Sequence, residues 1–138
     1  METQGIWQKN ILVVEDEPSI ARVCARTLAA EGYQVETVVN GRLAQGTLGK
    51  KDYDLYIVDI RTPEMNGMEL YQAMKKVSRT LAGRVLFTTG DTLSGNIREF
   101  LDCTGQPYLA KPFTPDELRG LVRMALKSNA GVPTSATP

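Results

Sequence analysis

The sequence predicts an α/β fold in which helices cover both faces of a doubly wound parallel β-sheet. Short apolar runs alternate with amphipathic runs about five times along the chain, a pattern typical of such a sheet. The apolar runs are continuous, as in strands buried on both faces. The chain has 138 residues, of which 42% are hydrophobic. This length and composition suit one compact domain and exclude most multidomain arrangements.

Each expected strand is a short apolar or β-branched run that ends at charged or turn residues. The run 11–14 ends at three consecutive acids, and the run 54–60 carries Asp59 near its end. The other strands are expected at 33–39, 84–89 and 108–110. The sequence thus places several charged residues directly at the carboxyl ends of strands.

Five helices are expected, at 18–31, 42–48, 68–77, 96–101 and 115–127. Pro18 suits a first helical turn, and Gly32 favours the end of that helix. The helix at 42–48 is expected to be short or irregular, because Gly46 and Gly49 each cost about 1 kcal/mol relative to Ala. The segment Thr114–Glu117 has the pattern of a capping box and predicts a well-defined start for the last helix.

The two ends of the chain show no periodic apolar pattern. We expect an N-terminal extension at 1–9, a domain at 10–127, and a disordered tail or the start of a linker at 128–138. The first residues lack the pattern of a signal peptide, and no apolar run approaches the length of a membrane span. A cytoplasmic domain without membrane contact is therefore expected.

Charge and residue content exclude several kinds of site. Lys plus Arg total 16 and Asp plus Glu total 16, so no overall basic field favours direct binding of nucleic acid. The chain has no histidine, which excludes a His-based triad and a Cys/His zinc site within it. Cys24 and Cys103 show no ligand spacing, and we interpret both as buried thiols in a reducing compartment.

The polar residues at the strand ends predict a site for a metal and a phosphoryl group. Ligands of doubly wound sheets bind at the carboxyl ends of the strands, where Glu15, Asp16, Asp59, Thr89 and Lys111 are expected. Converging carboxylates repel by roughly 1 to 4 kcal/mol per close pair unless a cation lies among them. All-oxygen ligands favour Mg²⁺. A carboxylate beside Mg²⁺, an ammonium and a hydroxyl can accept a phosphoryl group.

Four segments, in order, resemble the receiver domain of two-component response regulators. They are ILVVEDEP at 11–18, DIRTPEMNG at 59–67, TTG at 88–90 and YLAKPF at 108–113. The resemblance covers nearly all of 10–127. It implies a flavodoxin-like, three-layered fold with strand order 2-1-3-4-5 and five helices.

The resemblance also implies a role for each site residue. It implies that Asp59 is the phosphoacceptor and that Mg²⁺ is held by Asp16, Asp59 and the Arg61 carbonyl, with help from Glu15. It also implies that Thr89 hydrogen-bonds the phosphoryl group and that Lys111 pairs with it. Tyr108 is implied to be an aromatic switch, and the Lys111–Pro112 bond to be cis. Thr88 is the alternative to Thr89, which we prefer because Gly90 follows it and lets a ligand approach the backbone.

Two features depart from the family's common pattern or vary within it. The acidic pair is Glu15–Asp16 where Asp-Asp is commoner, and the longer Glu15 side chain can still reach a metal-bound water. Arg61 and Asp91 occupy variable positions that face the phosphoryl site in such domains. We hypothesise that they pair across the mouth of the site, hinder the attacking water and prolong the phosphoryl state.

The implied partners are a sensor histidine kinase or histidine phosphotransfer protein as donor, and a downstream protein or fused domain as output. Dimerisation is possible through the face formed by 96–101, 108–110 and 115–127. The chain resembles both stand-alone receivers and receivers of hybrid sensor histidine kinases. It is expected to catalyse only its own phosphoryl transfer and autodephosphorylation.

Two alternatives stay open at this point. One is a pseudo-receiver that binds partners without phosphorylation, against which the joint presence of Asp59, Thr89 and Lys111 argues. The other is a phosphatase with an aspartyl nucleophile. Haloacid-dehalogenase-type enzymes need a second Asp two residues after the nucleophile, and Arg61 occupies that position here.

Overall fold

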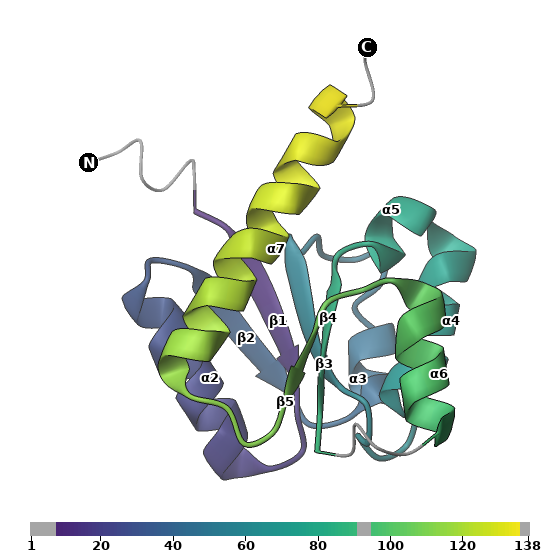
Figure 1. Ribbon diagram of the computed structural model, residues 1–138, viewed down its shortest axis with the longest axis horizontal. Coiled ribbons are helices and arrows are strands. Elements are labelled where there is room, and N and C mark those ends of the chain that lie inside the picture. The colour runs from purple at the N-terminus through teal and green to yellow at the C-terminus, as the bar shows by residue number, and fades with distance from the viewer. Residues whose placement is uncertain (1–7, 91–94, 136–138) are drawn as a thin grey trace.

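The computed structural model describes residues 8–90 and 95–135, with side chains up to residue 129. At its centre is a parallel sheet of five strands in the order β2-β1-β3-β4-β5 (Figure 1). The strands are β1 (Asn10–Val14), β2 (Gln34–Val38), β3 (Leu55–Asp59), β4 (Val85–Thr89) and β5 (Tyr108–Ala110). The predicted strand order is confirmed. The order reverses between β1 and β3, which places a ligand site at the carboxyl ends of these two strands.

Helices cover both faces of the sheet, as predicted, and give three layers (Figure 1). Within the described residues they are α2 (Pro18–Ala30), α3 (Gly41–Gln45), α4 (Gly67–Val77), α5 (Arg79–Ala82), α6 (Gly95–Thr104) and α7 (Pro115–Ser135). The core on one face is shared with α2 and α7, and the core on the other face with the remaining helices.

The alternation of side chains along the central strands explains the two cores. In β1, Ile11 and Val13 belong to the core beneath α2 and α7, whereas Leu12 and Val14 belong to the opposite core. All four are fully buried. A strand buried on both faces must be apolar at every position, which is why the run carried no strand-like polar alternation.

The part of the chain that the structure describes contains six helices, so the expectation of five was wrong by one. The additional helix, α5, has four residues and follows α4 directly. Ser78 caps it, because its side chain accepts a hydrogen bond from the Leu81 amide at 3.2 Å. The helix α3 is short, as predicted.

The last helix starts as predicted but ends later. The Glu117 amide donates to Thr114 Oγ1 at 3.1 Å and the Thr114 amide donates to Glu117 Oε1 at 2.8 Å, which confirms the capping box. The helix continues to Ser135, past the expected end at residue 127, and the expectation of a disordered tail or the start of a linker at 128–138 stays a prediction. The Asn129 side chain donates to the Asp54 carbonyl at 3.3 Å and holds this turn against the domain.

The cysteines differ in environment. Cys24 lies on the buried side of α2, as predicted, but Cys103 is exposed, so the expectation of two buried thiols was wrong. In α6, Ile97 and Leu101 occupy the buried stripe, and Cys103 lies on the outer side of the helix. Among the described residues, no helix combines the length and apolar character that crossing a bilayer requires.

Candidate functional site

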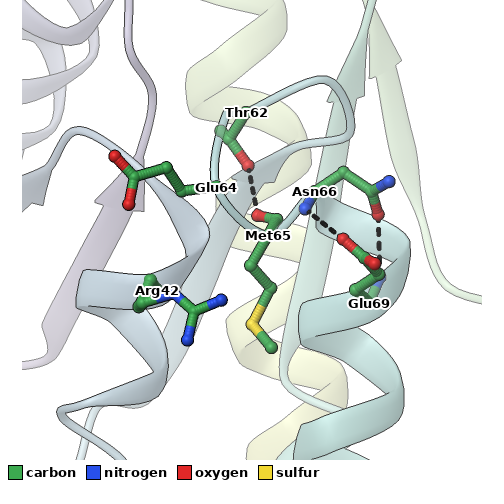
Figure 2. Close-up of a pocket in the computed structure, with 6 residues that line it drawn as sticks. All are labelled: Arg42, Thr62, Glu64, Met65, Asn66 and Glu69. Atoms are coloured by element: carbon green, nitrogen blue, oxygen red, sulfur yellow. Dashed lines mark hydrogen bonds between the residues drawn. The ribbon is translucent and has the colours of Figure 1, made fainter.

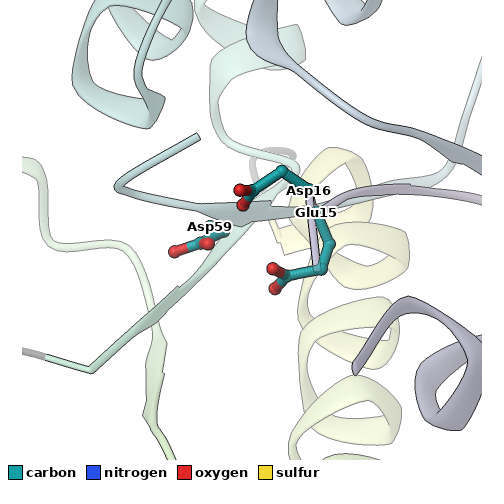
Figure 3. Close-up of side chains that lie close together, drawn as sticks. All are labelled: Glu15, Asp16 and Asp59. Atoms are coloured by element: carbon teal, nitrogen blue, oxygen red, sulfur yellow. The ribbon is translucent and has the colours of Figure 1, made fainter. Parts of the chain in front are cut away.

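Three carboxylates meet where the strand order reverses. Glu15 and Asp16 follow β1 directly, and Asp59 is the last residue of β3 (Figure 3). One oxygen atom from each carboxylate lies within 4.8 Å of the other two. Glu15 is 4% exposed and Asp59 5% exposed, while Asp16 is open to solvent. The predicted acidic cluster is therefore assembled, with one member at its mouth.

Lys111 forms ion pairs with both buried carboxylates of this cluster. Its Nζ lies 2.9 Å from Glu15 Oε1 and 3.1 Å from Asp59 Oδ2. The residue follows β5, and its amide donates to the Thr89 carbonyl at 2.8 Å, which ties it to the end of β4. The Lys111–Pro112 bond is cis, as predicted. The two strand ends thus hold the ammonium between two acids.

Burial and ion pairing set the charge of these groups. Burial raises the pKa of Glu15, and the neighbouring Asp59 carboxylate raises it further, although the Lys111 hydrogen bond opposes both. Burial alone would lower the pKa of Lys111, but its bonds to Glu15 and Asp59 outweigh this effect and raise it. Lys111 therefore carries a full positive charge at neutral pH.

Backbone groups orient the Asp59 side chain. The Arg61 amide donates to Asp59 Oδ1 at 3.2 Å, so the two carboxylate oxygens of Asp59 face different donors. The Thr62 amide donates to the Asp59 carbonyl at 3.3 Å. The loop after β3 thus folds back on the residue that the sequence predicts to react.

A pocket of about 440 Å³ lies on the outer side of this loop, between α3 and α4 (Figure 2). It is lined by Arg42, Thr62, Glu64, Met65, Asn66 and Glu69. The side chains of Asn66 and Glu69 each accept a hydrogen bond from the other residue's backbone amide, which caps the start of α4. Thr62 Oγ1 donates to the Met65 carbonyl at 3.1 Å. Thr62 is buried, and the sequence analysis missed it because a lone threonine in a loop gives no signal.

Thr89 and Tyr108 lie where the sequence placed them. Thr89 is the last residue of β4 and is fully buried, as is its neighbour Thr88, so the choice between the two stays a prediction. Tyr108 is the first residue of β5 and is 38% exposed. Arg61 is exposed in the loop after β3, whereas Asp91 lies outside the described residues.

The donor set fits Mg²⁺. The cluster offers only oxygen atoms, and a partly open arrangement with few carboxylates leaves room for the waters and phosphate oxygens that Mg²⁺ keeps. The soft sulfur and imidazole ligands that select zinc or copper are missing from the described cluster. Glu15 and Asp59 are also close enough for a single cation to relieve their repulsion.

A second depression borders the same site. It measures about 440 Å³ and is lined by Ser19, Ile20, Val23, Lys111, Pro112 and Phe113. Apart from Lys111 and Ser19 this lining is apolar, and Val23 is 44% exposed on α2. The depression therefore gives an apolar surface that leads to the ammonium group.

Comparison with known proteins agrees with this geometry. The family model described as "Response regulator receiver domain" matches residues 11–123. The transcriptional regulatory protein TcrA of Mycobacterium tuberculosis is 35% identical over 127 residues, which cover 92% of this chain and 49% of TcrA. The chain spans about half the length of the curated relatives it matches.

Solved structures agree as well. A CheY-like receiver domain protein from Methanospirillum hungatei superposes with a TM-score of 0.81 at 26% identity, covering 89% of this chain and 97% of that one. The receiver domain of sensor histidine kinase PA1611 from Pseudomonas aeruginosa gives 0.76 at 28% identity, covering 87% and 98%, and has a magnesium ion in its active-site cleft. The chain belongs to the receiver domains of two-component response regulators.

Proposed function

We propose that Asp59 accepts a phosphoryl group from a phosphohistidine donor, with Mg²⁺ as cofactor. The observation that carries this proposal is the position of Lys111 Nζ, 2.9 Å from Glu15 and 3.1 Å from Asp59, beside a third carboxylate at the carboxyl edge of the sheet. The burial of Asp59 at a strand end, next to an ammonium and two further carboxylates, supports a role as nucleophile in addition to its bond to the turn that follows β3.

The transfer needs one bond to form and one to break. A carboxylate oxygen of Asp59 attacks phosphorus, and the phosphorus–nitrogen bond to the donor's imidazole breaks, with its electron pair staying on the imidazole nitrogen. Lys111 stabilises the charge on the phosphoryl oxygens, and the Thr89 hydroxyl bonds one of them. The Arg61 amide fixes the Asp59 carboxylate during the attack.

Asp16, Asp59 and the Arg61 carbonyl would hold Mg²⁺, with Glu15 assisting through a water molecule. The bound ion supplies positive charge that the phosphoryl oxygens need as they approach the carboxylates. The fit of the oxygen donors to a hard ion supports this assignment.

The output passes through a protein contact. Phosphorylation would draw Thr89 toward the phosphoryl group, and Tyr108 would turn from its exposed position into the space that Thr89 leaves. The changed surface is the face of α6, β5 and α7, which would bind a downstream protein, a fused domain or a second copy. No direct contact with nucleic acid is proposed.

The donor is a sensor histidine kinase or a histidine phosphotransfer protein. We infer that it docks in the apolar depression beside Lys111, because a donor seated there can bring its phosphohistidine to Asp59. A cytoplasmic location follows from such a donor, whose phosphoryl group comes from ATP.

Intact-protein mass spectrometry after incubation with acetyl phosphate and Mg²⁺ tests the proposal. Wild-type protein is expected to gain one phosphoryl group that is not formed when EDTA is present, while Asp59→Asn gains none. A different result is that wild-type protein binds Mg²⁺ and yet gains no phosphoryl group from acetyl phosphate or from a phosphohistidine donor. This result would favour the pseudo-receiver alternative.

A further inference from the structure

The first residue of α3 is in unusually close contact with the loop that follows the phosphoacceptor. A Cβ atom built on Gly41 would lie 1.9 Å from the Met65 carbonyl oxygen and 2.8 Å from its carbonyl carbon. Both of these atoms belong to the backbone, so a rotamer change cannot relieve the overlap. The Gly41 amide also donates a hydrogen bond to the Pro63 carbonyl, with 3.4 Å between nitrogen and oxygen. Only glycine allows this approach.

A short series of hydrogen bonds connects this loop, which follows β3, to Asp59. The Met65 carbonyl, which Gly41 touches, accepts from Thr62 Oγ1 at 3.1 Å. The Thr62 amide in turn donates to the Asp59 carbonyl, and the Arg61 amide donates to Asp59 Oδ1. Figure 2 shows α3, marked by Arg42, beside the loop that carries Thr62 and Met65.

The loop needs such support because part of its backbone is strained. Glu64 has a φ of 61° and Met65 a φ of 153°, backbone angles that residues other than glycine rarely adopt. Strained backbone of this kind persists only where the surroundings hold it in place. Gly41, at the N-terminus of α3, packs against the backbone of Met65, and its amide donates to the carbonyl of Pro63.

We propose that Gly41 is a positioning residue for the metal and phosphoryl site. By lacking a side chain it lets α3 set the backbone of Pro63–Met65, which fixes the Arg61 amide and carbonyl relative to Asp59. The inference rests on the proposed function in that the Arg61 carbonyl is taken as a metal ligand. Groups that orient metal ligands typically change metal affinity by about 10- to 100-fold when they are altered.

The test compares Gly41→Ala with Gly46→Ala, a matched control at the other end of α3. A Cβ atom on Gly46 would meet the Leu43 carbonyl at 3.4 Å, and its φ of −64° suits alanine. Thr62→Val is a second variant that removes the hydroxyl bonded to Met65 while keeping the side chain's shape. Mg²⁺ affinity is measured for each protein by amide NMR titration, together with melting temperature and the rate of phosphorylation by acetyl phosphate.

The expected result is a folded Gly41→Ala protein that binds Mg²⁺ about 10-fold or more weakly, a smaller loss in Thr62→Val, and little change in Gly46→Ala. The Arg61 amide resonance of metal-free Gly41→Ala should also move. A Gly41→Ala protein with a lower melting temperature but unchanged Mg²⁺ affinity would overturn the inference, since its role would then be structural. If Gly41→Ala fails to fold, unchanged affinity in Thr62→Val overturns it.

The same measurements separate this inference from the proposed function. Wild-type protein that binds Mg²⁺ but forms no aspartyl phosphate from any donor refutes the proposed function, while the Mg²⁺ affinities of the variants still decide the role of Gly41. Wild-type protein that binds no Mg²⁺ refutes both.

Discussion

Lys111 joins the carboxylates of Glu15 and Asp59, with its Nζ 2.9 Å from Glu15 Oε1 and 3.1 Å from Asp59 Oδ2. The three residues come from the ends of β1, β3 and β5, so this contact forms only when the sheet has the order observed. One ammonium between two buried acids leaves one negative charge uncompensated, and the nearby Asp16 adds another. The site thus keeps an affinity for a further cation.

Replacing Lys111 by methionine should make the domain more dependent on Mg²⁺. Without the ammonium, two buried carboxylates repel each other, and the free energy of unfolding should fall by about 1 to 3 kcal/mol in the absence of metal. Mg²⁺ should then raise the melting temperature of Lys111→Met more than that of wild type, as measured by calorimetry.

The control for this change is Lys127→Met, which removes an exposed lysine of α7. Its response to Mg²⁺ should equal that of wild type. An equal Mg²⁺ response in Lys111→Met would contradict the interpretation of Lys111 as the counter-ion of the cluster.

Replacing Val23 by aspartate should separate the small-molecule donor from the protein donor. Val23 is 44% exposed in the apolar depression beside Lys111, and a charge there would disfavour docking. Transfer from a phosphohistidine protein should slow, while the rate with acetyl phosphate stays unchanged. Val77→Asp, on α4 and 59% exposed, is the matched control and should leave both rates unchanged. Equal slowing by both variants would argue against docking in this depression.

Replacing Arg61 by alanine should shorten the lifetime of the phosphoryl group. In our hypothesis Arg61 pairs with Asp91 across the mouth of the site and hinders the attacking water, so Asp91→Ala should have the same effect. Loss of radiolabel from purified phosphoprotein in Mg²⁺ buffer measures the rate. Rates identical to wild type in both variants would remove the hypothesis.

The two cysteines should differ sharply in reactivity. Burial, followed by the charge of Glu15, raises the pKa of Cys24 to about 12, so almost no thiolate forms near pH 8. Cys103 is exposed and should react with iodoacetamide in the folded protein, whereas Cys24 should react only after unfolding. Modification at Cys24 under native conditions, located by peptide mapping, would contradict this assignment.

The sign of the pH effect at Cys24 follows from the same shift. The unfolded thiol ionises near its ordinary pKa of 9.0, whereas the folded thiol stays protonated up to about 12. The stability that Cys24 contributes is therefore complete below pH 9 and is lost as the pH rises through this window. A Cys24→Ala variant should lack that part of the alkaline loss of stability.

Much of this architecture could be predicted from local pattern. The runs at 11–14 and 54–60 are short and mainly apolar, as is typical of buried strands, and both form strands. The capping box at Thr114 predicted where α7 begins. The end of α7 could not be predicted, because Asn129 is held by the Asp54 carbonyl, a residue far away in the sequence. The exposure of Cys103 depends likewise on which stripe of α6 faces the sheet.

The site divides in the same way. Glu15, Asp59 and Lys111 could be named because strand ends in a parallel sheet converge, a rule that needs no side-chain detail. Thr62 and Gly41 could not, because their importance lies in contacts with the Met65 carbonyl that only the folded chain brings together. The helix α5 could not be predicted for a different reason, because four residues carry too little periodicity to indicate a helix.

The most direct test of the central claim is to locate the phosphoryl group on the chain. The phosphorylated protein is reduced with borohydride, which converts an aspartyl phosphate to homoserine, and the peptides are sequenced by tandem mass spectrometry. We expect homoserine at position 59 and nowhere else, and none in Asp59→Asn. Homoserine at position 16, or a phosphoryl group found on a serine or threonine, would contradict it.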